Sequence, residues 1–246
     1  MRIRMLGDIF REMIAIVEIL GEATFKFTRE GIEVNQLLNA KTCMLRWNVK
    51  EEMLERYEIG ENDEILFALD SRFVKGMKRE KTDYVELEFK NNELKITMIN
   101  EKSGVKRRVR GQVIEPGEIN EGVAKVPEVV KFMIYPSEMY KILNALKRKD
   151  ASFRIRANKS RIIFELVDPN VFKEVELSAS SDIIGMYEVD SDEEVVSKYR
   201  LEAVMKFCEA TKDFDAYTIS FGEYTPLKIV ARKYSSLEYL IAHVVE

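Results

Sequence analysis

Hydrophobic and polar residues alternate along this chain with two different periods. Most segments follow the two-residue period of a β-strand, as in TFKFT, YVELEF, SFRIRA and LKIVARK. Four stretches instead repeat apolar residues every three to four positions, which predicts one-sided helices over residues 7–20, 71–79, 137–149 and 200–212. Few helices among many strands predict an α+β protein with antiparallel sheets.

The spacing of the four predicted helices repeats along the chain. Phe10 and Phe73, on the first two helices, are 63 residues apart, and Met139 and Leu201, on the last two, are 62 apart. The halves are offset by roughly 129 residues, which indicates an internal duplication. The segment EPGEINEGVAKVPEV fits neither half, and its Pro, Gly and Glu content is typical of an exposed connector. We therefore expect two domains and a connector, over residues 1–114, 130–246 and 115–129 respectively.

The charge and composition of the chain indicate how it interacts with nucleic acid and membranes and in which state its thiols are. The 246 residues carry 39 basic and 43 acidic side chains, so the formal charge of −4 gives no overall attraction to nucleic acid. Cys43 and Cys208 stand in apolar surroundings and are expected to be buried, reduced thiols. The N-terminal segment lacks a signal-peptide core and no apolar run is long enough to span a bilayer. We therefore expect an intracellular protein with no membrane partner.

Basic residues recur on all four predicted helices, outside their apolar stripes. The segment KILNALKRK, residues 141–149, has four basic side chains and no acidic one. Cations suit the C-terminal turn of any helix, so each basic cluster taken alone is accounted for by an ordinary solvent-facing surface. Recurrence in a duplicated fold favours instead a common basic surface that contacts phosphate backbones rather than base edges.

The order and spacing of several motifs give a resemblance to a known family. The segments EATFKFTREGIEVNQL, YPSEMYKIL, ISFGEYTPLKI and LEYLIAH resemble, in order, those of DNA sliding clamps of the proliferating cell nuclear antigen (PCNA) family, archaeal type. The resemblance covers essentially the whole chain. It implies the DNA-clamp fold: two topologically similar domains, each with two helices packed on antiparallel sheets. It also implies assembly into a trimeric ring whose helices line a central hole around duplex DNA.

The resemblance assigns DNA-facing positions to the basic residues of the helices. Glu202 and Glu209 depart from the family, since they stand near positions that are usually basic. The expected DNA-binding residues are Arg11, Lys75, Lys78, Arg79, Lys141, Lys147, Arg148, Lys206 and Lys212.

A second implied surface is a pocket beneath the connector that accepts a short peptide from client proteins. The segment LNAK, residues 38–41, and the tail residues Ala242 to Val244 depart from the family's usual motifs, which suggests different client preferences and suits a subunit of a heterotrimeric ring. The matching pocket residues are Leu37, Thr42, Met44, Val123, Val126, Pro226, Leu240 and Ala242.

Two charged segments are expected to be edge strands that join subunits head to tail. VKRRVRGQV is strongly basic and FKEVELS carries two glutamates, so the pairing would be complementary in charge. Charged edges also protect a monomer from aggregation, and this alternative stays open. The expected interface residues are Lys106, Arg107, Arg108, Val109 and Arg110 on one side, and Lys173, Glu174, Val175 and Glu176 on the other.

The function implied by the resemblance is that of a processivity factor rather than an enzyme. Its partners would be duplex DNA without sequence preference, other clamp subunits in a homo- or heterotrimer, replicative polymerase, flap endonuclease, ligase and a clamp loader. The expected location is the cytoplasm or nucleoid of an archaeon, or the nucleus if the source is a eukaryote. No cofactor, metal site or catalytic residue is expected. The alternatives are a specialised or checkpoint-type clamp scaffold and a nucleic-acid-processing enzyme. For the enzyme, the acidic run DSDEE and the single histidine, His243, are the only candidate groups.

Overall fold

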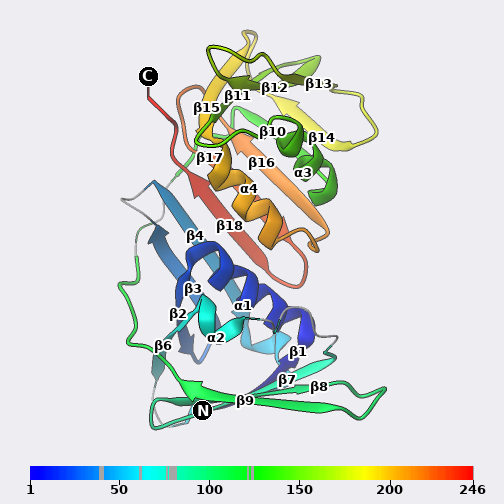
Figure 1. Ribbon diagram of the computed structural model, residues 1–246. Coiled ribbons are helices and arrows are strands. Elements are labelled where there is room, and N and C mark those ends of the chain that lie inside the picture. Colours follow the sequence, from blue (N-terminus) through cyan, green and yellow to red (C-terminus); the bar gives the residue numbers. More distant parts are fainter. Residues whose placement is uncertain are drawn as a thin grey trace. The chain divides into compact units, whose positions relative to one another are not determined.

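The computed structural model describes residues 1–38, 42–60, 63–75, 77, 82–120, 122 and 125–245. The chain forms two compact units (Figure 1). The first unit consists of Met1–Gln36, Arg46–Glu121 and Tyr234–Ser236, and the second of Leu37–Leu45, Gly122–Lys233 and Leu237–Glu246.

The first unit has two antiparallel sheets and two helices. One sheet has the strand order β5-β1-β7-β8-β9, and in the other β4, β3, β2 and β6 are neighbours in that order. The elements are β1 Arg2–Leu6, α1 Gly7–Leu20, β2 Glu22–Thr28, β3 Gly31–Leu38, β4 Cys43–Lys50, a 3-10 turn Glu51–Met53, β5 Arg56–Glu58, β6 Glu64–Asp70, α2 Ser71–Val74, β7 Tyr84–Lys90, β8 Glu93–Ile99 and β9 Lys106–Gln112.

Helix α1 forms the centre of the first unit because it contacts strands of both sheets, β1 and β7 in one and β2 in the other. Ten of its 14 residues are buried, including one acidic side chain, Glu12. Aromatic rings fill the space beside it: Phe25 lies edge-on to Trp47 at 6.3 Å, and Phe67 stacks on Phe27 at 4.8 Å. In the described part of the chain no helix is long and apolar enough to cross a membrane.

The second unit repeats this arrangement. Its sheets have the orders β13-β12-β11-β15 and β14-β10-β16-β17-β18. Helices α3 and α4 lie side by side (Figure 1). The elements are β10 Val130–Ile134, α3 Pro136–Ala145, β11 Ser152–Asn158, β12 Arg161–Val167, β13 Glu174–Ser178, β14 Ile184–Val189, β15 Val195–Arg200, α4 Leu201–Ala210, β16 Ala216–Phe221, β17 Leu227–Arg232 and β18 Ser236–Ile241.

The duplication extends to single hydrogen bonds. In each unit one strand, one helix, five strands, one helix and three strands follow in the same order. The Tyr57 hydroxyl, on β5, is 2.7 Å from the carbonyl oxygens of Thr28 and Gly31, which flank the β2–β3 turn. The Tyr187 hydroxyl, on β14, makes the same two contacts at 2.7 Å, to Asn158 and Arg161 beside the β11–β12 turn. Tyrosines at equivalent positions therefore hydrogen-bond to equivalent turns in the two units, as expected of a duplicated fold.

Three helices end earlier than the periodicity predicts, and α1 alone has the predicted limits. Helix α2 begins at the Asp70 cap, whose carboxylate accepts from the Phe73 amide at 2.8 Å, but ends after one turn because Lys75 has the extended backbone angles φ −55° and ψ 122°. Helix α3 ends at Ala145, and α4 ends before Thr211, whose hydroxyl bonds the carbonyl of Phe207. The prediction that 147–149 and 212 are helical was therefore wrong.

The segment after β9 is exposed, as predicted for a connector, but it is hydrogen-bonded to the first unit. Ile114 and Ala68 exchange backbone hydrogen bonds of 3.2 and 3.3 Å. Farther along, the Gly117 amide donates to the Thr24 hydroxyl at 2.8 Å, and the Asn120 amide donates to the Asn35 carbonyl at 2.9 Å. These backbone contacts depend on residues distant in sequence, so composition alone did not reveal them.

Candidate nucleic-acid interface

In the first unit, the exposed surface of α1 is narrow and mixed in charge. Most of the helix is buried, and the charged side chains that reach solvent are Asp8, Arg11 and Glu18. Arg11 forms an ion pair with Asp8, one turn earlier on the same helix. Arg11, the expected DNA-facing residue of α1, is therefore already paired with a carboxylate of the same helix.

The short helix α2 adds a basic residue that the sequence patterns missed. Arg72 has 89% of its side chain exposed and pairs with Asp70 at 2.5 Å. The Phe73 backbone amide and then the Arg72 side chain stabilise the charged carboxylate, which lowers the pKa of Asp70. Lys75 is exposed and makes no ion pair with a described residue. The expected DNA-facing residues Lys78 and Arg79 lie outside the described residues.

In the second unit, charges of both signs share the outer surfaces of α3 and α4. Lys141 is exposed and donates to Glu138 at 2.7 Å. On α4, Lys206 lies between the exposed residues Glu202 and Glu209. The outer surface of α4 is therefore mixed in charge, as the departures at Glu202 and Glu209 indicate, and on α3 Glu138 lies beside Lys141.

The basic residues after α3 form a separate group. Lys147, Arg148 and Lys149 are exposed, and the Arg148 Nε lies 2.7 Å from the carboxylate of Asp168, in the turn after β12. Lys173 approaches the same group, since its ammonium donates to the Lys147 carbonyl at 3.4 Å. Lys147 and Lys149 keep their charges free of ion pairs with described residues. Lys147, Arg148, Lys149 and Lys173 therefore form one cationic group after α3.

The expected peptide-pocket residues differ in how accessible they are. Leu37 is 40% exposed, whereas Met44 and Leu240 are 5% and 4% exposed and belong to the core of the second unit. Thr42 and Ala242 are brought together, since the Ala242 amide donates to the Thr42 carbonyl at 2.8 Å. Val126 and Pro226 are half-buried, and Val123 lies outside the described residues.

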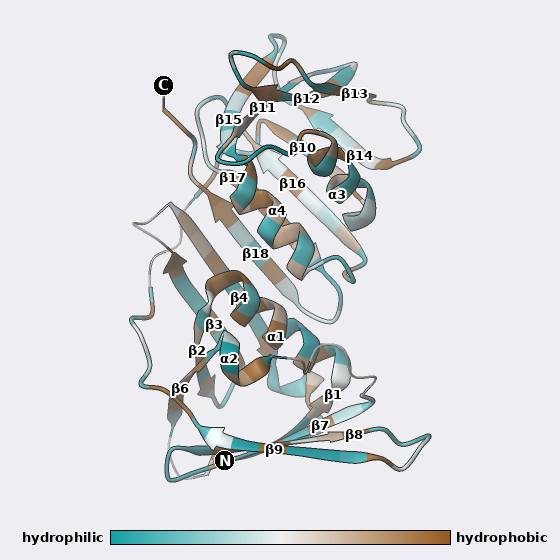
Figure 2. Cartoon of the chain, viewed as in Figure 1, coloured by the Kyte–Doolittle hydropathy of each residue, from teal (hydrophilic) through white to brown (hydrophobic). Residues whose placement is uncertain are grey.

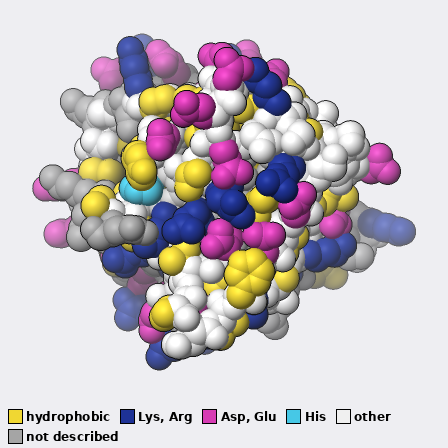
Figure 3. Space-filling view, turned by 90° about the horizontal axis from the view of Figure 1, so that it is seen from above, with side chains coloured by type: hydrophobic (Ala, Val, Ile, Leu, Met, Phe, Trp, Pro, Cys, Tyr) yellow, Lys and Arg dark blue, Asp and Glu magenta, His cyan; other side chains and the backbone are white. Residues whose placement is uncertain are grey.

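Beside these residues lies an aromatic group that the pocket prediction omitted. His243 lies edge-on to Tyr224 at 5.4 Å, and Tyr224 is 71% exposed. The His243 Nδ1 is 2.9 Å from the Ser197 hydroxyl and accepts from the Lys198 amide at 3.3 Å. The amide must donate, so Nδ1 is unprotonated in this arrangement. The histidine, cyan in Figure 3, therefore lies on the surface with a structural partner.

Strands β9 and β13 are edge strands of their sheets, as predicted. Strand β9 is hydrophilic over nearly all its length (Figure 2), and Lys106, Arg107, Arg108 and Arg110 are exposed, with Val109 half-buried. On β13, Glu174 and Glu176 are exposed, and Lys173 and Val175 are half-buried. Each strand therefore has a neighbouring strand on one side only and forms a charged edge of its sheet. Their role in joining subunits stays a prediction.

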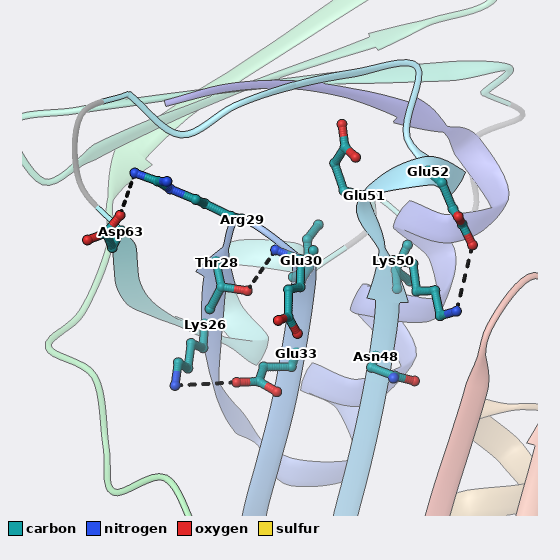
Figure 4. A pocket seen from close by; sticks show the side chains of 13 residues that line it. Lys26, Thr28, Arg29, Glu30, Glu33, Asn48, Lys50, Glu51, Glu52 and Asp63 are labelled. Carbon is teal, nitrogen blue, oxygen red and sulfur yellow. Dashed lines mark hydrogen bonds and ion pairs between the residues drawn. The ribbon is translucent and has the colours of Figure 1, made fainter.

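A hollow of about 830 Å³ lies at the end of β2, β3 and β4 (Figure 4). Its walls carry the ion pairs Arg29–Asp63, at 2.7 Å, and Lys26–Glu33, at 3.5 Å. It contains none of the expected site residues. Among the described residues no group of three or more His, Cys, Asp or Glu side chains is placed to hold a metal ion.

Comparison with known proteins identifies relatives over nearly the full chain, although no family model matches it. DNA polymerase sliding clamps from Thermococcus fumicolans and Thermococcus onnurineus are each 24% identical over 242 residues, which is 96% of this chain and 95% of theirs. The sliding clamp of Pyrococcus furiosus is 22% identical over 231 residues, covering 93% and 91% of the two chains.

Solved structures show the same fold. PCNA from Thermococcus kodakaraensis matches with a TM-score of 0.87 and 20% identity, over 99% of both chains. A chain of the PCNA2–PCNA3 complex from Sulfolobus tokodaii matches with a TM-score of 0.83 and 18% identity, over 100% of both. The resemblance to archaeal sliding clamps of the PCNA family is therefore confirmed, and the chain has the DNA-clamp fold.

Proposed function

We propose that this chain is a subunit of a DNA sliding clamp that encircles duplex DNA and holds polymerase and other enzymes on it. The observation that carries the proposal is the duplicated topology, in which both units have the same elements, pairings and Tyr-fastened turns. This topology coincides with that of PCNA over 99% of the chain. The proposed role is that of a scaffold, not of an enzyme.

The charged edges support assembly with other clamp subunits. The basic edge of β9 complements the glutamates of β13, and a head-to-tail contact between different edges generates a ring if the rotation closes. The neighbour is a second copy of this chain or a related clamp subunit. A heteromeric ring is supported by the similarity to the PCNA2–PCNA3 complex.

The helix sides support a weak contact with DNA that is independent of sequence. Exposed lysines such as Lys75, Lys147, Lys206 and Lys212 are suited to phosphate contacts, which carry no base information. Acidic neighbours such as Glu202 and Glu209 limit the attraction. A weak grip suits a clamp, since closure around the duplex, rather than affinity, keeps it in place. Client peptides would bind near Leu37, Pro226 and Ala242.

The test is to measure the solution mass by light scattering and then the processivity of a polymerase on primed circular DNA. A trimer, alone or with related subunits, that lengthens the products would support the proposal. Substituting Lys75, Lys147 and Lys206 by Ala should reduce the stimulation while the trimer remains. A monomer that neither assembles with other clamp subunits nor stimulates polymerase would contradict the proposal.

A further inference from the structure

Arg72 joins the expected DNA-facing residues that the structure describes. Half of these basic residues are already paired with a carboxylate of the same unit. The pairs are Arg11–Asp8, Arg72–Asp70 at 2.5 Å, Lys141–Glu138 at 2.7 Å and Arg148–Asp168 at 2.7 Å. We call these the four paired cations. Lys75, Lys147, Lys206 and Lys212, by contrast, make no ion pair with a described residue.

Helix propensity does not account for the four pairs together. Two of them, Arg11–Asp8 and Lys141–Glu138, have the i,i+3 spacing that stabilises an isolated helix by a few tenths of a kcal/mol. Arg148 and Asp168 lie on different loops, and Asp70 precedes the helix that Arg72 belongs to. A property shared by the whole surface, rather than the stability of any one helix, is therefore needed to explain the four ion pairs.

The members of each pair also differ consistently in exposure. The carboxylates of Asp8, Asp70, Glu138 and Asp168 are 21%, 17%, 26% and 11% exposed, whereas their cations are 31%, 89%, 69% and 40% exposed. In every pair the acid lies deeper and the base lies outside it. A phosphate approaching the cation would therefore also meet a negative charge fixed just beneath it.

We propose that Asp8, Glu138 and Asp168 act as built-in counter-ions that weaken the contact of this chain with the DNA backbone. The inference rests on the proposed function and deepens it. Without DNA these carboxylates hold Arg11, Lys141 and Arg148. A phosphate group must compete with them, so each contact neutralises less charge than a free cation would. The result is a surface that attracts the duplex without fixing it.

The test neutralises these three carboxylates with isosteric amides, in the variant Asp8→Asn, Glu138→Gln, Asp168→Asn. Asp70 is left unchanged because it caps α2 through the Phe73 amide. In Asp168→Asn the side-chain oxygen that accepts from the Asn170 amide at 2.9 Å is retained. Binding to a short fluorescein-labelled DNA duplex is followed by anisotropy over a salt series, for the purified chain in its native assembly.

Exposed ion pairs are worth about 0.2–1 kcal/mol, so each freed cation should raise affinity by about 1.5- to 5-fold. The triple variant should bind on the order of tenfold more tightly, and the slope of log affinity against log salt should steepen by up to about one unit for each freed cation. If the triple variant has a lower melting temperature than the parent, the single variant Glu138→Gln tests the change in DNA affinity and salt slope at one site.

A matched control removes the same amount of negative charge elsewhere. Glu58 pairs with Arg56 at 2.7 Å, Glu88 with Lys95 at 2.8 Å and Asp63 with Arg29 at 2.7 Å. Glu58 and Glu88 are both opposite Arg2 in their sheet, on the solvent side away from the core. The variant Glu58→Gln, Glu88→Gln, Asp63→Asn should change DNA affinity by less than about twofold.

The outcomes separate the inference from the proposed function. Tighter binding and a steeper slope for the helix-side variant alone would support the counter-ion role. Equal gains in both triple variants would show a net-charge effect and overturn it, and so would weaker binding, which would mean that the carboxylates position the cations. If the variant Lys75→Ala, Lys147→Ala, Lys206→Ala also binds DNA as the parent does, the DNA-facing surface itself is wrong.

Discussion

Removal of the buried carboxylate of Glu12 should destabilise the first unit strongly. Glu12 is 1% exposed on α1 and gathers three donors from two other segments. The Trp47 Nε1 donates to it at 3.1 Å and the Tyr234 amide at 3.2 Å, and the Ser235 hydroxyl donates as well. One acidic side chain therefore joins α1 to β4 and to the segment Tyr234–Ser236.

The expected loss follows from these three bonds. A hydrogen bond to a charged group contributes about 1.5–3 kcal/mol, but the cost of burying the carboxylate disappears with it. Trp47 keeps a bond of 2.6 Å to the Ser235 hydroxyl, whereas the Tyr234 amide and the Ser235 hydroxyl each lose the bond that they donate to Glu12. We expect Glu12→Ala to lower the free energy of unfolding by about 3 kcal/mol. Glu12→Gln retains the volume and one acceptor and should cost about half as much.

The chain offers a direct assay, because Trp47 is its single tryptophan and is 2% exposed. Its fluorescence in a urea titration reports the unfolding of the first unit. Glu18→Ala, the same substitution at an exposed position of α1, is the matched control and should change the unfolding free energy by less than about 0.5 kcal/mol. If Glu12→Ala behaves like this control, the carboxylate does not hold the three segments together.

Three further predictions follow from single contacts. Burial raises the pKa of Tyr57 and of Tyr187 to about 12, so their neutral hydroxyls stabilise the fold below pH 10 and this contribution is lost as the pH rises from 10 towards 12. Urea titrations at pH 9 and pH 11 should therefore show that Tyr57→Phe loses less unfolding free energy than the parent as the pH rises. At pH 9 the variant should be about 1 kcal/mol less stable than the parent. Arg156 forms ion pairs with three carboxylates, and two of them, Glu165 on β12 and Glu174 on β13, are directly opposite each other. Arg156→Met should therefore lower the free energy of unfolding by about 1–2 kcal/mol, with partial recovery in high salt. An unchanged melting temperature at low salt would contradict this prediction. Burial also raises the pKa of the Cys208 thiol to about 12, so a disulfide reagent should modify it only after unfolding, and rapid reaction of the native protein would refute that placement.

Much of the fold was determined by local patterns in the sequence. The start of α1, the alternating strands and the duplication all follow from periodicities that act over a few residues or repeat at a fixed offset. The buried state of Cys43 and Cys208 was predicted correctly from their apolar neighbours. These features depend on which side of an element is apolar, and the sequence states that directly.

The tertiary structure decided the charge of the helix side and the ends of the helices. Whether Arg148 is free depends on Asp168, 20 positions away along the chain, and no periodicity relates the two. Helix α3 ends at Ala145 although basic, helix-favouring residues follow, since the chain must turn there to enter β11. An ion pair or a helix end depends on where distant backbone segments meet, and that is fixed only when the sheets pack.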